Sequence, residues 1–110
     1  MPRPRFVPKT EPDMLEGYIV KKIIKRFEST GWLHRKVVYQ GRRGAADDWF
    51  FGYGRRIIII EFKRPKKDAT LQQGREHDRF RERGFPIYVI NNLEDGFALH
   101  ARLEEIEGLA

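Results

Sequence analysis

The sequence has no cysteine among its 110 residues. This excludes both a disulfide framework and a zinc site made of thiolates, and it favours a reducing compartment. Long apolar runs are missing as well, since none approaches the roughly 20 residues that a membrane-spanning helix needs. The N-terminal residues, Met-Pro-Arg-Pro-Arg, lack the apolar core of a secretion signal. We therefore expect a soluble, cytoplasmic protein with one domain and a single modest core.

Proline is scarce except near the N-terminus, where four of the 6 prolines lie at positions 2, 4, 8 and 12. Proline fixes φ and removes a backbone donor, so residues 1–12 are not expected to be helical. Because Arg3 and Arg5 alternate with these prolines, the segment is predicted to be an extended basic arm. Residues 13–110 are then expected to form the folded domain.

Charge is distributed unevenly along the chain. Residues 1–67 contain 17 Lys or Arg against 7 Asp or Glu, whereas residues 68–110 contain 5 against 9. A clustered cationic surface attracts phosphates, so the pattern indicates a polyanionic partner such as nucleic acid. The simpler interpretation is that the basic residues only keep the domain soluble. The first interpretation is favoured because the basic part also contains a cluster of acids.

Four consecutive isoleucines, at positions 57–60, predict a strand that is buried on both faces. Since side chains alternate along a strand, Glu61 and Lys63 then share one face, while Phe62 points to the other. A carboxylate and an ammonium group on one face of a core strand are unusual. They are either a solvated ion pair at the strand end or part of a site.

A second strand is predicted around Trp49 to Phe51, and the glycine-rich segment 52–55 joins it to the isoleucine strand as an antiparallel hairpin. This hairpin brings Asp47 or Asp48 towards Glu61. One or two carboxylates, with water and substrate phosphate, are the ligands that Mg²⁺ commonly takes. A nearby lysine can orient the attacking water and offset charge on the phosphoryl group.

An amphipathic helix is expected from about residue 13 to residue 29. At 100° per residue, Glu16 falls on the same stripe as the apolar residues Val20, Ile23 and Phe27. A carboxylate on a core-facing stripe is expensive unless a cation or a hydrogen bond satisfies it. Alternatively, Glu16 is simply an acid in the first turn, where the helix dipole favours it.

The other segments complete the order α-β-β-β-α-β-α. His34 has no second nitrogen or thiolate ligand near it in the sequence, so we expect it to be a packing or surface residue. A central mixed sheet flanked by helices in three layers, an α/β architecture, would cover the buried strand on both faces. The remaining elements are expected at residues 32–40 (strand), 70–83 (helix), 85–91 (strand) and 93–106 (helix).

The ordered set of motifs resembles the virus-type replication-repair nuclease (VRR-NUC) domain of the PD-(D/E)xK nuclease superfamily. This resemblance covers residues 14 to about 100 and implies a restriction-endonuclease-like fold. The family includes stand-alone phage and bacterial proteins and the catalytic domain of the Fanconi-associated nuclease. The residues that carry the resemblance are Glu16, Gly44-Ala45-Ala46-Asp47, Glu61-Phe62-Lys63, and Gln73 followed by Gly84.

Two features depart from the family pattern. The usual Gly-x-Pro-Asp motif has Ala46 in place of proline, and a second acid, Asp48, follows Asp47. Counting from the glycine favours Asp47, and only one of two adjacent strand residues can face the site unless a bulge intervenes. The spacing from Glu61 likewise favours Gln73, although Gln72 remains an alternative.

The resemblance implies an endodeoxyribonuclease that depends on Mg²⁺ or Mn²⁺. Asp47, Glu61 and the backbone carbonyl of Phe62 would hold the ion, and Lys63 would position or activate the water. Gln73 would fix that water or the lysine, and Glu16 would complete the acidic pocket. DNA would be bound by Arg42, Arg43, Lys66 and Lys67.

The expected substrate is the four-way (Holliday) junction. The enzyme is expected to be a homodimer encoded by a phage or prophage. A monomeric flap or nicking nuclease, a tRNA or restriction-type nuclease, and a non-catalytic DNA-binding module of the same fold are the alternatives. The complete set of acids argues against the last of these.

Overall fold

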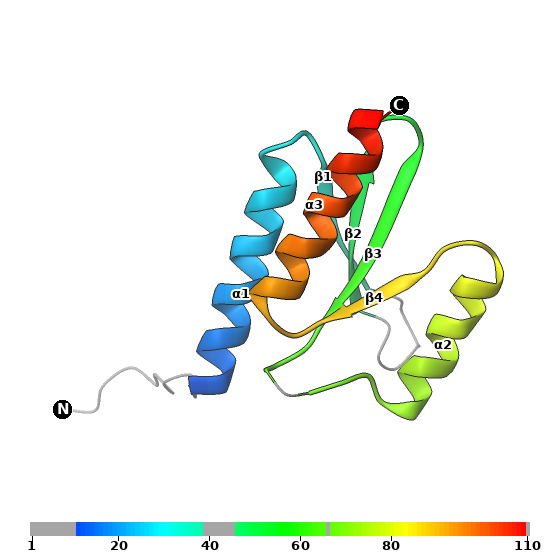
Figure 1. Cartoon of the computed structure of the whole chain (residues 1–110). Helices are drawn as coiled ribbons and strands as arrows, with labels where there is room; N and C mark the ends of the chain where they lie inside the picture. Colours follow the sequence, from blue (N-terminus) through cyan, green and yellow to red (C-terminus); the bar gives the residue numbers. More distant parts are fainter. Residues whose placement is uncertain (1–10, 39–45, 66, 110) are drawn as a thin grey trace.

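The computed structural model describes residues 11–38, 46–65 and 67–109 of the chain (Figure 1). The elements follow the expected order, which confirms the predicted fold class. The N-terminal arm over residues 1–10 lies outside the described residues. The elements are α1 (Glu11–Glu28), β1 (Leu33–Val38), β2 (Ala46–Gly52), β3 (Arg56–Phe62), α2 (Leu71–Glu82), β4 (Ile87–Ile90) and α3 (Leu93–Leu109).

The four strands form one mixed sheet in the order β1-β2-β3-β4. The first three strands pair antiparallel, and β4 joins β3 in parallel. As predicted, β2 and β3 form a hairpin, and its turn contains Gly54 at φ 76° and Arg55 at φ 65°. Such left-handed conformations match the twist of the two strands, so this short connection fixes their register.

Helix α1 begins at Glu11, two residues before the expected N-cap, Asp13. The expectation that no residue up to position 12 is helical was therefore wrong. Pro12 is tolerated because the backbone N–H groups of the first helical turn have no partner within the helix. None of the described helices is long and apolar enough to cross a lipid bilayer.

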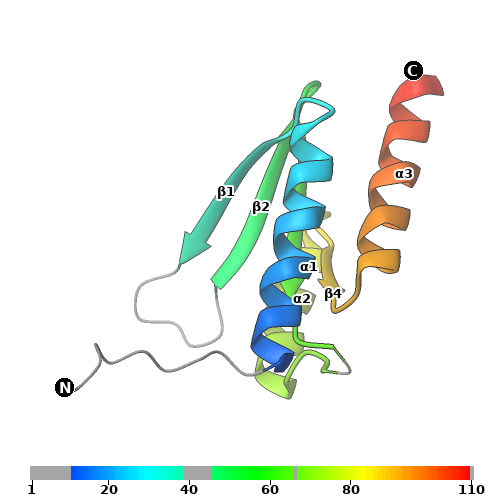
Figure 2. The ribbon, with the colours of Figure 1, turned by 90° about the vertical axis from the view of Figure 1, so that its left-hand side faces the viewer.

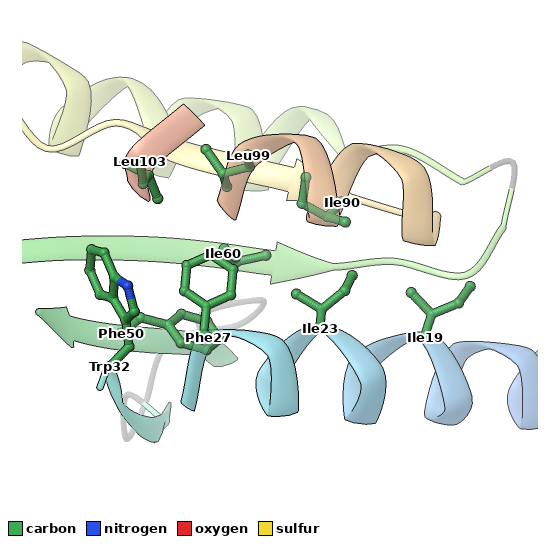
Figure 3. Packing of buried hydrophobic residues seen from close by; sticks show 9 residues of the cluster. All are labelled: Ile19, Ile23, Phe27, Trp32, Phe50, Ile60, Ile90, Leu99 and Leu103. Carbon is green, nitrogen blue, oxygen red and sulfur yellow. The ribbon is translucent and has the colours of Figure 1, made fainter. Parts of the chain in front are cut away.

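The core lies between the sheet and the pair of helices α1 and α3, which lie side by side (Figures 1 and 2). The largest fully buried side chains in it, Phe27 of α1 and Phe50 of β2, pack with ring centroids 4.6 Å apart. Helix α2 covers the opposite face, where Phe80 meets Trp49 edge to face at 6.3 Å. The described core side chains are Ile19, Ile23, Phe27, Trp32, Phe50, Ile60, Ile90, Leu99 and Leu103 (Figure 3).

Because side chains alternate along a strand, neighbouring residues of β2 and β3 face opposite sides of the sheet. Phe50 and Ile60 belong to the core beneath α1 and α3. Trp49, and Glu61 on β3, contact α2 instead. The three-layer arrangement thus places the face that carries Glu61 beneath a helix, and this positions the candidate site.

Helices α1 and α3 come into close contact at Gly96. A Cβ atom at this position would collide with Cδ1 and Cγ1 of Ile23, which is fully buried. We expect Gly96→Ala to destabilise the protein by about 1–3 kcal/mol, because the core must shift to admit the methyl group. Urea denaturation measures this free energy of unfolding.

Gly74 of α2 is the matched control, because a Cβ atom there meets nothing within 4 Å. Gly74→Ala should stabilise the protein by about 0.5–1 kcal/mol through the helix propensity of alanine. Equal stabilities for the two alanine variants would contradict the close approach of α1 and α3.

Candidate active site

Asp47 and Glu61 lie on the same face of neighbouring strands. Asp48 pairs with Ile60 across the β2–β3 ladder, so Asp47 and Glu61 are the next residues at that end of the hairpin. Both side chains are buried, each with 3% of its surface exposed. The hairpin register therefore brings two carboxylates together beneath α2.

Asp48 points to the opposite face of the sheet. Its Oδ1 atom lies 2.6 Å from Nε2 of His34 on β1, and the His34 ring packs against Phe50 of the core. The alternation leaves only Asp47 on the Glu61 side. His34, expected to be a packing or surface residue, is also the partner of Asp48.

Burial raises the proton affinity of both carboxylates. Burial raises the pKa of Asp47 to about 6, with a further contribution from the charge of Glu61. Burial also raises the pKa of Glu61, and the charge of Lys63 opposes this shift. Oε2 of Glu61 is buried and accepts no hydrogen bond from the described residues. This arrangement is unfavourable for two anions unless a cation joins them.

Lys63 brings a cationic group next to Glu61. Its Nζ atom lies 4.0 Å from Oε1 of Glu61, and its side chain is mostly buried. Phe62, between them, packs its ring against the core on the other face. Only the backbone of Phe62 can therefore serve the site.

Glu16 lies beside the same end of β3. It lines a cavity of about 430 Å³ together with Lys63, and its Oε2 atom is 3.7 Å from Nε of Arg64. The side chain is 34% exposed, so it is at the margin of the core rather than inside it. The full lining of the cavity is Glu16, Phe62, Lys63, Arg64, Lys67, Asp68 and Thr70.

Gln73 caps the first turn of α2 rather than pointing at the carboxylates. Its Oε1 atom accepts a hydrogen bond from Thr70 N, and Thr70 Oγ1 accepts one from Gln73 N, which is a complete capping box. The hydrogen bond from Thr70 N thus occupies the side-chain oxygen of Gln73, the residue that was expected to fix the water or Lys63. Its neighbour Gln72 is exposed.

His77 is the residue that the sequence analysis did not single out. Its Nε2 atom lies 2.8 Å from Oε2 of Glu61, and its ring is buried. Burial lowers the pKa of His77 despite the charge of Asp47, which favours the neutral ring. The available signal was its position one helical turn after Gln73, on the side of α2 that faces the sheet.

Of the predicted DNA-binding residues, Lys67 is described and is exposed at the cavity that Lys63 and Glu16 line. Arg42, Arg43 and Lys66 lie outside the described residues. The described cations at this cavity are Lys63, Arg64 and Lys67.

The residues present fit a hard divalent ion. Two buried carboxylates on one face of the sheet, those of Asp47 and Glu61, supply the oxygen ligands that Mg²⁺ and Mn²⁺ take. Within the described parts of the chain, no three His, Asp or Glu side chains converge as a complete ligand set. An ion held by Asp47 and Glu61 would therefore complete its shell with backbone oxygen, water or phosphate, as Mg²⁺ usually does.

Asp47→Asn is expected to stabilise the metal-free protein by about 1–2 kcal/mol at pH 7, after allowance for solvent screening. The pKa of Asp47 is raised from 3.8 to about 6 by folding, so the folded state binds its proton more tightly than the unfolded state. The stability of metal-free wild-type protein should thus fall as the pH rises from 4 to 6. Thermal unfolding in EDTA measures both effects, and an Asn variant that is less stable than wild type at pH 7 would contradict the account.

This fold and this face of two acids and a lysine define an α/β nuclease domain. No family model matches the chain. It is 30% identical over 79 residues to "Putative nuclease p44" of Acyrthosiphon pisum secondary endosymbiont phage 1. The matched residues cover 72% of this chain and 85% of that protein. A solved structure described as "VRR_NUC domain" matches with a TM-score of 0.74 and 34% identity, over 78% of this chain and 94% of the other. The chain belongs to the VRR-NUC family.

Proposed function

We propose that this protein is an endodeoxyribonuclease that hydrolyses phosphodiester bonds with Mg²⁺ or Mn²⁺. The observation that carries the proposal is the placement of Asp47, Glu61 and Lys63 on one face of the β2–β3 hairpin, with both acids buried. Burial of like charges is costly and is characteristic of functional sites rather than of packing. The nuclease named among the relatives and the VRR-NUC structure support the same activity.

Each residue has a distinct task in this reaction. Asp47 and Glu61 would hold the ion, with the backbone carbonyl of Phe62 as a further ligand. The bound ion would polarise the phosphoryl oxygen and lower the pKa of the attacking water. Lys63, beside Glu61, orients that water and stabilises the negative charge that develops on the phosphate.

The cavity next to Lys63 provides a place for the DNA backbone. Lys67 and Arg64 line it, and cationic side chains fix the position of phosphates without reading the bases. Glu16 lines the same cavity and adds a negative charge to it. This mixture of charges suits a phosphate that is bridged to carboxylates by a metal ion.

A panel of labelled DNAs tests the activity. Wild-type protein should cleave at least one of linear, nicked, flapped and four-way DNA in Mg²⁺ or Mn²⁺, and EDTA should abolish the cleavage. Binding of all these DNAs without any cleavage would support a non-catalytic module instead. Cleavage that persists in EDTA would contradict the assigned roles of Asp47 and Glu61.

The substrate that we propose is the four-way junction, cut by a homodimer. One site cuts one strand per encounter, whereas resolution of a junction needs two symmetric cuts, which a two-fold dimer supplies. Strand β1 is an edge of the described sheet, and Leu33 and Val38 on it are exposed. An exposed edge strand with apolar residues is a suitable surface for a second copy. The phage source of the relative supports a phage or prophage origin.

Sedimentation at micromolar concentration and cleavage of a cruciform plasmid test the substrate and the assembly together. The proposal predicts a dimer and linearisation of the plasmid by paired cuts. A monomer that leaves the plasmid nicked in one strand would identify a flap or nicking nuclease.

A further inference from the structure

Glu61 lies between two donors that come from different layers. Lys63, directly after the strand that carries Glu61, is 4.0 Å from its Oε1 atom, and His77, on α2, is 2.8 Å from its Oε2 atom. The imidazole is 5% exposed, so it is beyond direct reach of a DNA substrate. The 2.8 Å contact lacks hydrogen-bond alignment, and Oε2 has no other described donor.

We propose that His77 is a positioning residue, which donates Nε2–H to Oε2 of Glu61 and thereby directs Oε1 towards the metal ion beside Lys63. This inference rests on the proposed metal-dependent function. A Mg²⁺ ion prefers oxygen ligands, so the imidazole supports the carboxylate rather than binding the ion itself. Once Glu61 is ionised, both of its oxygens are acceptors, and this selects the tautomer with the proton on Nε2.

The capping box explains how α2 places this imidazole. Thr70 and Gln73 fix the first turn of the helix, and His77 follows Gln73 by one turn on the same side. Gln73 thus acts on the site through the position of the helix. Loss of the capping box would displace His77 without removing any group that contacts the ion.

Metal affinity without DNA tests the proposal, measured by electron paramagnetic resonance of free Mn²⁺. His77→Leu removes the donor while keeping a buried apolar side chain, and it should weaken Mn²⁺ binding roughly 10–100-fold. His77→Gln carries a side-chain N–H donor and should restore most of this loss. Cleavage by His77→Leu should then need more Mn²⁺ but reach a rate close to that of wild type. His100→Gln, in a separate contact with Thr30, is the control and should bind Mn²⁺ as wild type does.

Wild-type protein gives a second test that does not depend on the folding of any variant. Ring ¹⁵N resonances of His77 in the Mg²⁺-bound protein should show a neutral ring with the proton on Nε2. A bare Nε2, or equal losses of Mn²⁺ affinity in His77→Leu and His77→Gln, would overturn the positioning role while leaving the nuclease proposal standing. Wild-type protein that binds no Mn²⁺ at all would overturn both.

Discussion

Asp47→Asn is expected to lower the rate of metal-dependent DNA cleavage at least about a thousandfold, a loss of several kcal/mol of transition-state stabilisation. The amide keeps the shape of the side chain but removes one of the two charges that hold the ion. Asp48→Asn, one residue further along, should stay within a few fold of wild type because its side chain points to the other face of the sheet. Single-turnover cleavage of labelled DNA at saturating Mn²⁺ measures both rates.

Asp47→Asn and Asp48→Asn make a stringent comparison, because they are the same chemical change on opposite faces of the sheet. The amide oxygen introduced by Asp48→Asn can still accept a hydrogen bond from His34, so this variant should also remain folded. An inactive Asp48→Asn together with an active Asp47→Asn would mean that β2 presents the opposite face to Glu61.

Lys63→Met should lower kcat roughly 10²–10⁴-fold while leaving Mn²⁺ affinity nearly unchanged. The methionine keeps the unbranched stem that is buried beside Glu61 but cannot orient water or offset charge on the phosphate. Lys22→Met on α1 is the matched control, because its ammonium lies over the exposed ring of Tyr18. Rates from a metal titration separate the two effects.

Lys67→Met should instead raise KM with little change in kcat, since this exposed side chain lines the cavity where a phosphate would lie.

A Lys63→Met enzyme that cuts at the wild-type rate would remove Lys63 from the mechanism. A loss of Mn²⁺ binding in that variant would show that Lys63 acts on Glu61 alone.

The sheet and its hairpin were predictable because their signals are local. The isoleucine run at 57–60 and the glycines at 52 and 54 define strands and a turn without any knowledge of the rest of the fold. The two-residue period then requires Asp47 and Asp48 to face opposite sides. What it does not determine is which side α2 covers, since that depends on packing between distant segments.

The helix boundaries and the role of α2 were harder to predict from the sequence. Pro12 was taken as the end of an arm, but a proline fits the first turn of a helix equally well. His77 was not predicted as a site residue, because a lone histidine in a helix gives no sign of its partner. Its contact with Glu61 joins residues 16 positions apart across two layers.

The most direct measurement is an anomalous difference map from a crystal of the protein soaked in Mn²⁺. We expect a peak between the carboxylates of Asp47 and Glu61, on the α2 side of the sheet, and its loss in Asp47→Asn. A map with no peak there, or with the ion bound beside Asp48 and His34 on the other face, would contradict this expectation.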